Sequence, residues 1–330
     1  MSAANNGDIV MQYIKRFSTL EKATLARKIY ADYPDVFMSV ESVRDAIRYY
    51  TGKRGKKALG RVERSNKLLV MESVNPYDLP EPTEELWEPY YLRKDISNWL
   101  VISDLHLPYY DREAVNLTID WAKKHDTQGI LINGDMIDFY QVSVWGKDPT
   151  RMTVRAELDM ATEFLSKLHD IFKVPIVYKM GNHEERVQWY LRRKAPELYD
   201  VIEWRMDKLY DWQKYNVEVV EDQRMVYAGK LPILHGHELQ LKSVAVNPAR
   251  SVFLKGKQSC LVSHTHRVSE HTEPSLEGNL FTTWSIGCLC NLHPEYSRIN
   301  QWAHGFCFIQ VDSSGHYKVR NKRIYKGEIL

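Results

Sequence analysis

From residue 98 onward, the apolar residues follow a pattern that alternates between short strands and amphipathic helices. Residues 98–103 (NWLVIS), 129–134 (GILING) and 174–181 (VPIVYKMG) are typical of buried strands. Between them, apolar residues recur at helical spacing over 112–125 and 154–172. This β-α-β-α-β order predicts parallel strands joined by right-handed crossovers. The second half of the chain is mostly strand-like, which predicts a second sheet packed on the first in an α/β fold.

Each of these strands ends in side chains that can bind metals, and so do two later strands. In parallel α/β sheets, residues just past the carboxyl ends of the strands meet at one edge, so we expect these side chains to be neighbours. Carboxylates, imidazoles and an amide oxygen together suit Mn²⁺, Fe²⁺ or Zn²⁺ rather than Ca²⁺. They are numerous enough for two metal ions that share a carboxylate. In chain order they are Asp104, His106, Asp135, Asp138, Asn182, His183, Glu184, His235, His237, His264 and His266.

Taken singly, each of these clusters has an ordinary alternative. Asp104-x-His106 at a strand end is often a turn or a cap, Gly-Asp and Gly-Asn are common turn dipeptides, and His235 alone is typical of a half-buried histidine. The order and context favour a functional site, because five clusters each follow an apolar strand. His237 follows His235 closely, so an assignment with these two exchanged stays open.

The ordered set resembles the signature of the calcineurin-like metallophosphoesterases. It covers about residues 98–290, and its motifs are Asp104-Leu-His106, Gly134-Asp135-Met-Ile-Asp138, Gly181-Asn182-His183-Glu184, His235 and His264-Thr-His266. The resemblance implies a four-layer αββα sandwich of two mixed sheets flanked by helices, which we expect over residues 98–330. It also implies a dinuclear metal centre at one edge of this sandwich.

The resemblance assigns the metal ligands by motif. One metal ion would be held by Asp104, His106 and His266. The other would be held by Asn182, His235 and His264, and Asp135 would bridge the two. We expect Mn²⁺ as the cofactor, with Fe, Zn or Ni as alternatives.

The remaining motif residues are interpreted as catalytic or supporting groups. The two cations would activate a hydroxide for attack on a phosphate ester. His183 would protonate the leaving oxygen, and it joins Asp135 and Asn182 in the catalytic set. Asp138 and Glu184 are interpreted as carboxylates that fix the orientation of imidazole ligands.

The first 70 residues are predicted to form a basic helical module. They contain 14 Lys and Arg against 7 Asp and Glu, although the net charge of the whole chain is only +2. Three short helices are predicted within residues 8–50, which suits a helix-turn-helix-like module with a third helix at about 41–50. A solvated helical face with a flexible tail is the open alternative. Residues 71–97 hold several prolines and acids and are predicted to be a linker.

Clustered Lys and Arg favour contact with nucleic acid, because binding them releases counterions from the phosphates. The candidate residues for this contact are Arg44, Arg48, Lys53, Arg54, Lys56 and Lys57. Near the expected metal centre, Phe139, Tyr140 and Trp145 are either base-stacking side chains or a hydrophobic wall.

We therefore expect a metallophosphoesterase that acts on nucleic acid, with DNA favoured, as a nuclease or an end-phosphatase. By resemblance, the chain is similar to the DNA-repair nucleases of the superfamily and to phage-borne phosphoesterases. A protein phosphatase is disfavoured, because Phe139 and Met180 stand where that subfamily has arginines. Two alternatives stay open: a small-molecule phosphatase or phosphodiesterase with an oligomerising N-terminal module, and a nucleic-acid-binding protein with a vestigial site.

The chain shows no signal for export or membrane insertion. No apolar run approaches the roughly 20 residues needed to cross a bilayer, and the N-terminus lacks the pattern of a signal peptide. The four cysteines (Cys260, Cys288, Cys290 and Cys307) lack zinc-type pairs and are interpreted as reduced core or strand residues. We expect a cytoplasmic protein without membrane contact, in the cytoplasm of a bacterial host if a phage encodes it.

Overall fold

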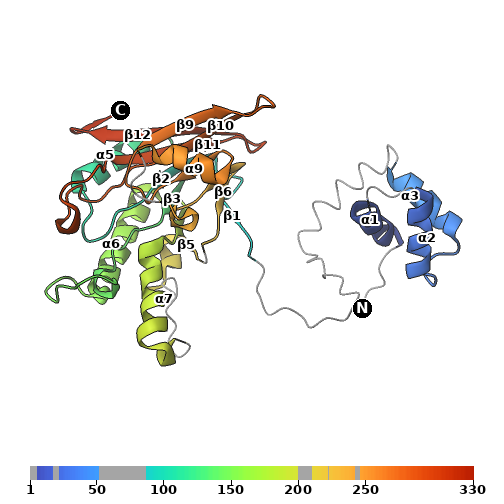
Figure 1. The fold of residues 1–330 in the computed structure, drawn as a ribbon, viewed down its shortest axis with the longest axis horizontal. Helices are drawn as coiled ribbons and strands as arrows, with labels where there is room; N and C mark the ends of the chain where they lie inside the picture. Colours follow the sequence, from blue (N-terminus) through green and yellow to red (C-terminus); the bar gives the residue numbers. More distant parts are fainter. Residues whose placement is uncertain (1–5, 18–21, 52–86, 200–209, 222, 242–245) are drawn as a thin grey trace. The chain divides into compact units, whose positions relative to one another are not determined.

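The computed structural model describes residues 6–17, 22–51, 87–199, 210–221, 223–241 and 246–330 (Figure 1). The chain divides into two compact units, Met1–Glu84 and Glu85–Leu330. Residues 71–86 of the predicted linker lie outside the described residues, as do Lys53, Arg54, Lys56 and Lys57. None of the helices in the described parts of the chain is both long and apolar enough to span a bilayer.

Three short helices make up the described part of the first unit, as the sequence predicts. They are α1 (Asn6–Arg16), α2 (Lys22–Asp32) and α3 (Val40–Thr51). Their apolar faces form one small core that includes Val10, Ile29, Val43 and Ile47. The Ser39 side chain accepts a hydrogen bond from the Ser42 N–H at the start of α3, and so replaces a bond that a helix start lacks.

The larger sheet of the second unit has seven strands in the order β13-β12-β11-β2-β3-β4-β5. Its parallel part consists of β2 (Asn98–Ile102), β3 (Gly129–Asn133), β4 (Ile176–Lys179) and β5 (Val217–Val220). Antiparallel to β2 runs β11 (His304–Val311), followed outward by β12 (Tyr317–Tyr325) and β13 (Glu328–Ile329). The predicted crossover helices are α5 (Arg112–Lys123) and α6 (Val154–Phe172).

The second sheet is also mixed and has six strands in the order β1-β6-β7-β8-β10-β9. They are β1 (Tyr90–Tyr91), β6 (Val226–Ala228), β7 (Leu231–Ile233), β8 (Cys260–Val262), β9 (Ser269–Pro274) and β10 (Leu280–Ser285). The end of the predicted linker is therefore part of this sheet, since β1 pairs with β6 and the neighbouring Leu92 and Ile96 are buried in the core. Tyr90, Leu92 and Ile96 give this stretch a face to bury, whereas Tyr91 is exposed.

The layers follow from the alternation of side chains along each strand. On one face of the larger sheet, Leu100 and Ile132 pack with residues of α5 and α6 such as Leu165. On the other face, Val101 and Leu131 pack against the second sheet. The far side of the second sheet is covered by α9 (Pro248–Gly256), which contacts β8, β9 and β10. The predicted four-layer αββα sandwich with a small N-terminal helical region is confirmed.

A further helix, α7 (Asn182–Lys194), begins directly after β4 and extends away from the sheets (Figure 1). Its first residue is a predicted metal ligand, so the helix leads outward from the edge where the parallel strands end. Short 3₁₀ helices occupy the loops: η1 (Tyr140–Val142), η2 (Pro196–Leu198), η3 (Trp212–Tyr215), η4 (His237–Leu239) and η5 (Glu295–Ser297).

Candidate metal centre

Five of the predicted ligands have a left-handed backbone conformation just after their strands. The φ angle lies between 49° and 64° at Asp104, His106, Asp135, His264 and His266. Residues other than Gly rarely adopt this region, which costs about 1–3 kcal/mol each and is concentrated at functional sites. The same strain at five potential metal-binding residues indicates that these strand ends are shaped for a site rather than for simple turns.

One set of side chains, here called the Asp104 group, consists of Asp104, His106 and His266. His266 Nε2 lies 3.1 Å from Asp104 Oδ1 and 3.2 Å from His106 Nε2, and all three side chains are buried. His106 Nδ1 lies 3.1 Å from Asp138 Oδ1, so this nitrogen carries a hydrogen and donates a hydrogen bond to the carboxylate. The lone pair of His106 Nε2 is therefore directed at His266.

The other set, here called the Asn182 group, consists of Asn182, His235 and His264. His235 Nε2 lies 3.2 Å from Asn182 Oδ1 and 3.2 Å from Asp135 Oδ2. Ligand atoms of Asp135, His235 and His264 all lie within 4.8 Å of one another. The same Asp135 Oδ2 lies 4.0 Å from His106 Nε2, so one carboxylate oxygen faces both groups.

The two neighbouring histidines of the fourth cluster have different surroundings. His235 Nδ1 lies 2.7 Å from the carbonyl oxygen of Asn133 and donates to it, which directs Nε2 into the centre. His237 is turned to two carboxylates instead, with Nε2 3.1 Å from Glu185 Oε1 and Nδ1 3.5 Å from Glu238 Oε2. Of these two residues, only His235 contacts the Asp135 carboxylate or the Asn182 amide.

The glycines before Asp135 and Asn182 allow the two strand ends to approach closely. A Cβ atom at Gly134, where φ is +89°, would lie 2.3 Å from His235 Nδ1. A Cβ atom at Gly181 would lie 2.3 Å from Asp135 Oδ1. Both positions therefore lack room for any side chain.

The two carboxylates predicted to orient imidazoles behave differently. The Asp138 carboxylate lies 3.1 Å from His106 Nδ1 and 3.2 Å from His183 Nδ1, where it can orient an imidazole. Glu184 differs, because its carboxylate accepts hydrogen bonds from the backbone N–H groups of Asp135, Ile137 and Gly181. It sits at the third position of α7 and reaches back to the helix start, so it fixes the backbone of two motifs rather than an imidazole.

The carboxylates of the centre raise the pKa of the imidazoles beside them. Burial alone would raise the pKa of Asp104, but the nearby His266 lowers it to about 2. Burial also lowers the pKa of a histidine, yet Asp135 raises the pKa of His235 to about 10, and Asp104 raises that of His266 to about 9. The carboxylates therefore require positive charge beside them.

The donor set fits divalent cations. Asp104 Oδ1 is buried with His266 Nε2 3.1 Å away, and the Nε2 atoms of His106 and His266 face each other across 3.2 Å. A buried carboxylate and two imidazole nitrogens at these distances are costly unless a cation or proton lies between them. Carboxylate oxygen and imidazole nitrogen are ligands for Mn²⁺, Fe²⁺ and Zn²⁺, and two such ions would supply the positive charge that the carboxylates require.

His183 lies at the rim of the centre and contacts a residue that sequence reasoning missed. Its Nδ1 lies 2.9 Å from the carbonyl oxygen of Asp138, and its Nε2 lies 2.7 Å from Arg186 Nη2. Arg186 also donates to the Asp138 carbonyl at 2.9 Å. The signal was available, because a residue three positions after His183 lies on the same face if the helix begins at Asn182.

Cys290 is the second residue whose surroundings the sequence did not indicate. Its Sγ lies within 4.8 Å of ring nitrogens of both His106 and His266, and the three residues are buried. The interpretation of all four cysteines as core or strand residues is therefore incomplete, because this thiol lies beside the Asp104 group. Its loop contacts the end of β2, since the N–H of Leu289 donates to the carbonyl of Asp104.

The near-site aromatic residues do not form one stacking surface. Phe139 is fully buried, with φ at 50°, and packs in the core beneath the centre. Base stacking by Phe139 is therefore wrong, whereas the hydrophobic-wall interpretation holds for this residue. Trp145 is 77% exposed and stays available for stacking.

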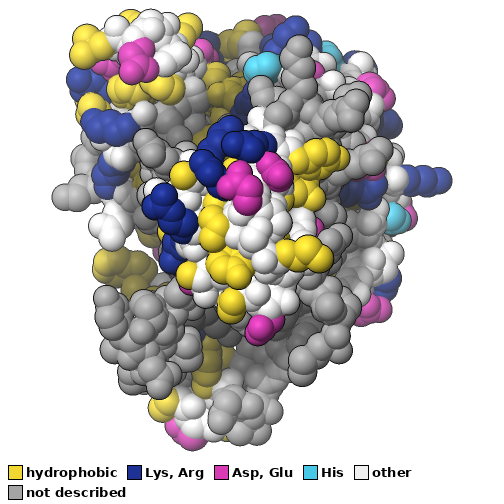
Figure 2. Space-filling model, turned by 90° about the vertical axis from the view of Figure 1, so that its right-hand side faces the viewer, with side chains coloured by type: hydrophobic (Ala, Val, Ile, Leu, Met, Phe, Trp, Pro, Cys, Tyr) yellow, Lys and Arg dark blue, Asp and Glu magenta, His cyan; other side chains and the backbone are white. Residues whose placement is uncertain are grey.

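Of the predicted nucleic-acid contacts on α3, Arg48 is exposed and Arg44 is partly buried, and both are paired with acids. Arg44 lies 3.1 Å from Glu41, and Arg48 lies 3.0 Å from Asp45. In the view of Figure 2, Lys and Arg side chains likewise lie beside Asp and Glu side chains. The described part of this unit carries seven Lys and Arg against five Asp and Glu, so most of the basic excess belongs to residues 52–70.

An αββα sandwich whose strand ends carry two adjoining carboxylate and imidazole groups defines a metal-dependent hydrolase. Residues 98–283 match the family model for calcineurin-like phosphoesterases, which is more than half of the chain. The chain belongs to this family, and the protein is a metallophosphoesterase.

Relatives of the chain include two phage proteins. The chain is 25% identical over 227 residues to the Gene 54 protein of Mycobacterium phage L5, covering 64% of this chain and 88% of that protein. It is also 25% identical over 229 residues to the Gene 54 protein of Mycobacterium phage D29, covering 65% and 89%. Among solved structures, Vacuolar Protein Sorting 29 from Cryptosporidium parvum aligns with a TM-score of 0.40 and 13% identity, over 71% of this chain and 95% of that one.

Proposed function

We propose that the protein hydrolyses phosphoester bonds of nucleic acid at a centre that holds two divalent cations. The observation that carries this proposal is the position of Asp135 Oδ2, which lies 3.2 Å from His235 Nε2 and 4.0 Å from His106 Nε2. A single carboxylate oxygen between two ligand groups is what a pair of cations needs as a bridge.

The ligands follow from this geometry. The Asp104 group would hold one cation and the Asn182 group the other, with Asp135 between them. Bound there, the two cations would neutralise the phosphoryl oxygens and activate the attacking water. The Asp138 carboxylate accepts a hydrogen bond from His106 Nδ1–H, and the Asn133 carbonyl accepts one from His235 Nδ1–H. In both imidazoles the lone pair of Nε2 is therefore available to a metal.

His183 is the residue that would supply a proton to the leaving oxygen. Its Nδ1–H is fixed by the Asp138 carbonyl, and its Nε2 accepts a hydrogen bond from Arg186. When a phosphate oxygen takes over the guanidinium of Arg186, Nε2 is free to take up a proton from solvent and to give it to the leaving oxygen. Arg186 thereby serves as the cation that grips the phosphate, a role for which the sequence motifs offered no arginine.

A nucleic-acid substrate is supported by charge. The first 70 residues carry a strong excess of Lys and Arg, concentrated at Lys53, Arg54, Lys56 and Lys57 and the residues that follow. Such a cluster favours a polyanion, since each neutralised phosphate releases counterions.

The test is an assay of the full chain with each of Mn²⁺, Zn²⁺, Fe²⁺ and Ni²⁺. We expect hydrolysis of an aryl phosphodiester or monoester with at least one metal, and cleavage or end-dephosphorylation of labelled single-stranded DNA, duplex DNA or RNA. No turnover of any substrate with any metal would contradict an active phosphoesterase. Turnover of aryl esters alone would favour a small-molecule substrate.

A second experiment separates the nucleic-acid proposal from an oligomerising role for the first unit. We expect replacement of Lys53, Arg54, Lys56 and Lys57 by Ala to weaken nucleic-acid binding and to flatten its salt dependence by up to about one unit per removed phosphate contact. Unchanged binding together with a changed molar mass in solution would favour the oligomerising role. The Arg48→Ala variant tests α3 in the same assay.

A further inference from the structure

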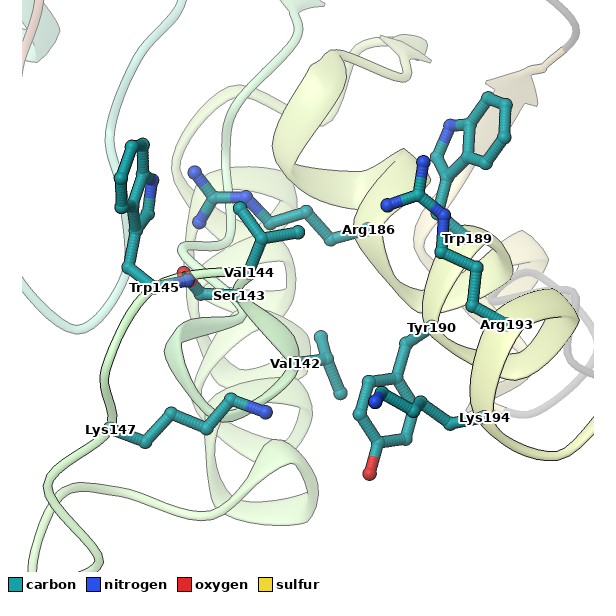
Figure 3. A pocket seen from close by; sticks show the side chains of 10 residues that line it. All are labelled: Val142, Ser143, Val144, Trp145, Lys147, Arg186, Trp189, Tyr190, Arg193 and Lys194. Atoms are coloured by element: carbon teal, nitrogen blue, oxygen red, sulfur yellow. Dashed lines mark hydrogen bonds between the residues drawn. The ribbon is translucent and has the colours of Figure 1, made fainter.

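A cavity of 530 Å³ lies beside the metal centre, between the loop after η1 and the outer part of α7. Its volume is within the range of ligand-binding sites. Figure 3 shows side chains of the loop facing side chains of α7 across it. Arg186 lines this cavity and also contacts His183, so one end of the cavity adjoins the rim of the centre.

The cavity lining is basic. It includes the cations Lys147, Arg186, Arg193 and Lys194, and it contains no acidic side chain. Lys147 comes from the loop and the other three come from α7, so the positive charge borders both sides. A concave surface of one sign concentrates ligands of the opposite sign, here a polyanion.

The lining also presents large aromatic rings to solvent. Trp145 is 77% exposed, Trp189 49% and Tyr190 37%. Lys147 Nζ lies 5.0 Å from the centre of the Tyr190 ring, and Arg193 lies 5.5 Å from that of Trp189. Exposed rings interleaved with cations are the composition of surfaces on which bases of single strands stack while the phosphates are neutralised.

The cavity residues that come from α7 form one row along the helix. Positions 186, 189, 190, 193 and 194 follow the three- and four-residue spacing of a single helix face. At about 1.5 Å per residue, the row extends about 12 Å from Arg186, enough for roughly three bases stacked about 3.4 Å apart. A small phosphate ester would reach only the end nearest His183.

We propose that this cavity binds the single-stranded segment of a nucleic acid next to the scissile phosphate. This inference rests on the proposed function and names its substrate form. In this proposal Trp145 and Trp189 stack on bases. The phosphates are contacted by Lys147, Arg193 and Lys194. Arg186 contacts the phosphate nearest the metal centre. A duplex is excluded from the cavity because its bases are already stacked on one another.

The test measures binding of a fluorescent single-stranded oligothymidylate by the full chain carrying His183→Ala, with Mn²⁺ present, using fluorescence anisotropy. We expect Trp145→Ala and Trp189→Ala each to weaken binding roughly 5- to 150-fold, and Trp145→Phe to restore most of the loss. Lys147→Glu should weaken binding and lower the salt slope by about one or more. The matched control is Lys214→Glu, an exposed lysine in η3 at the amino end of β5, which should bind like the parent protein.

Catalysis gives a second readout with His183 intact. The ratio of kcat/KM for the oligonucleotide to kcat/KM for an aryl phosphodiester should fall in the cavity variants through a higher KM for the oligonucleotide. If the parent protein turns over the aryl diester but neither binds nor cleaves the oligonucleotide, the nucleic-acid function fails. If it binds the oligonucleotide and the cavity variants bind equally well, only the cavity assignment fails.

Two competitors define what the cavity recognises. A duplex of the same sequence should compete weakly with the single strand, and equal competition would overturn the single-stranded assignment. Polyglutamate should not displace the oligonucleotide at equal charge, because it offers no rings to stack. Equal displacement by polyglutamate would mean that charge alone governs binding, and it would overturn the stacking proposal.

Discussion

His106 Nε2 lies 3.2 Å from His266 Nε2, although 160 residues separate them in the chain. His106 follows β2 of the larger sheet, and His266 follows β8 of the second sheet. The Asp104 group therefore spans the two sheets and exists only when they pack on each other. Two imidazole nitrogens this close repel unless a proton or a cation lies between them, so a bound cation should also stabilise the packed sheets.

The His183→Ala variant separates metal binding from proton transfer. His183 contacts Arg186 and the Asp138 carbonyl at the rim, and its Nε2 lies 3.8 Å from Asp135 Oδ2, but it is not a member of the Asp104 group or the Asn182 group. We expect unchanged metal content and a loss of about 10²–10⁴ in kcat for esters with poor leaving groups, which need the proton most. The loss should be smaller for an aryl ester such as a nitrophenyl phosphate. An equal loss for good and poor leaving groups would contradict the role of His183 as the acid.

The Asp138→Asn variant tests how imidazole orientation controls the centre. The Asp138 carboxylate lies 3.1 Å from His106 Nδ1, and an amide could present its NH₂ group there instead. His106 Nδ1 would then act as acceptor and Nε2 would carry the proton, which removes a metal lone pair. We expect metal affinity to fall about 10- to 100-fold, as measured by calorimetric titration. Affinity equal to that of the parent protein would contradict this orientation.

The Glu157→Gln variant tests a buried acid under the loop that leads to η1. Burial, together with the nearby Asp138 charge, raises the pKa of Glu157 from its usual 4.5 to about 8. Between these two pH values the folded protein holds a proton that the unfolded chain has lost. The free energy of unfolding should therefore fall as pH rises from 4.5 to 8, by up to about 4 kcal/mol from this group.

Glutamine has the size of protonated Glu157 and is uncharged at every pH, so it does not lose unfolding free energy as the pH rises. We expect the variant to gain stability over the parent protein at pH 8 and to show little gain at pH 5, in urea unfolding of protein treated with a chelator. Glu157 Oε1 accepts the N–H of Tyr140 at 3.3 Å, a bond that the amide oxygen can keep. An equal gain at both pH values would show that proton release from Glu157 is not responsible.

The sequence predicted most of the centre because one physical rule governs it. Polar residues after buried parallel strands must meet at the carboxyl edge, and that rule brought Asp104, Asp135 and Asn182 together without knowledge of side-chain positions. The order of strands and helices could also be predicted from the sequence, because apolar residues recur with a different period in strands and in helices. The four-layer arrangement itself came from the family resemblance and not from periodicity.

Other features depended on details that periodicity does not carry. Arg186 was missed because its position on the rim depends on where α7 begins. Phe139 is buried because its left-handed φ turns it into the core, and a run of aromatic residues gives no sign of that conformation. The short strand β1 was hidden in a stretch whose prolines and acids are typical of linkers.

The central claim is that Asp135 joins two groups of ligands into one centre for two cations. Metal analysis of the full chain, after loading with Mn²⁺ and removal of excess metal, tests it most directly, with the Asp135→Asn variant measured in parallel. We expect two ions per chain for the parent protein, and for the variant the loss of at least one ion together with its hydrolytic activity. An equal metal content in both proteins, or none in the parent protein with any of Mn²⁺, Zn²⁺, Fe²⁺ and Ni²⁺, would contradict the claim.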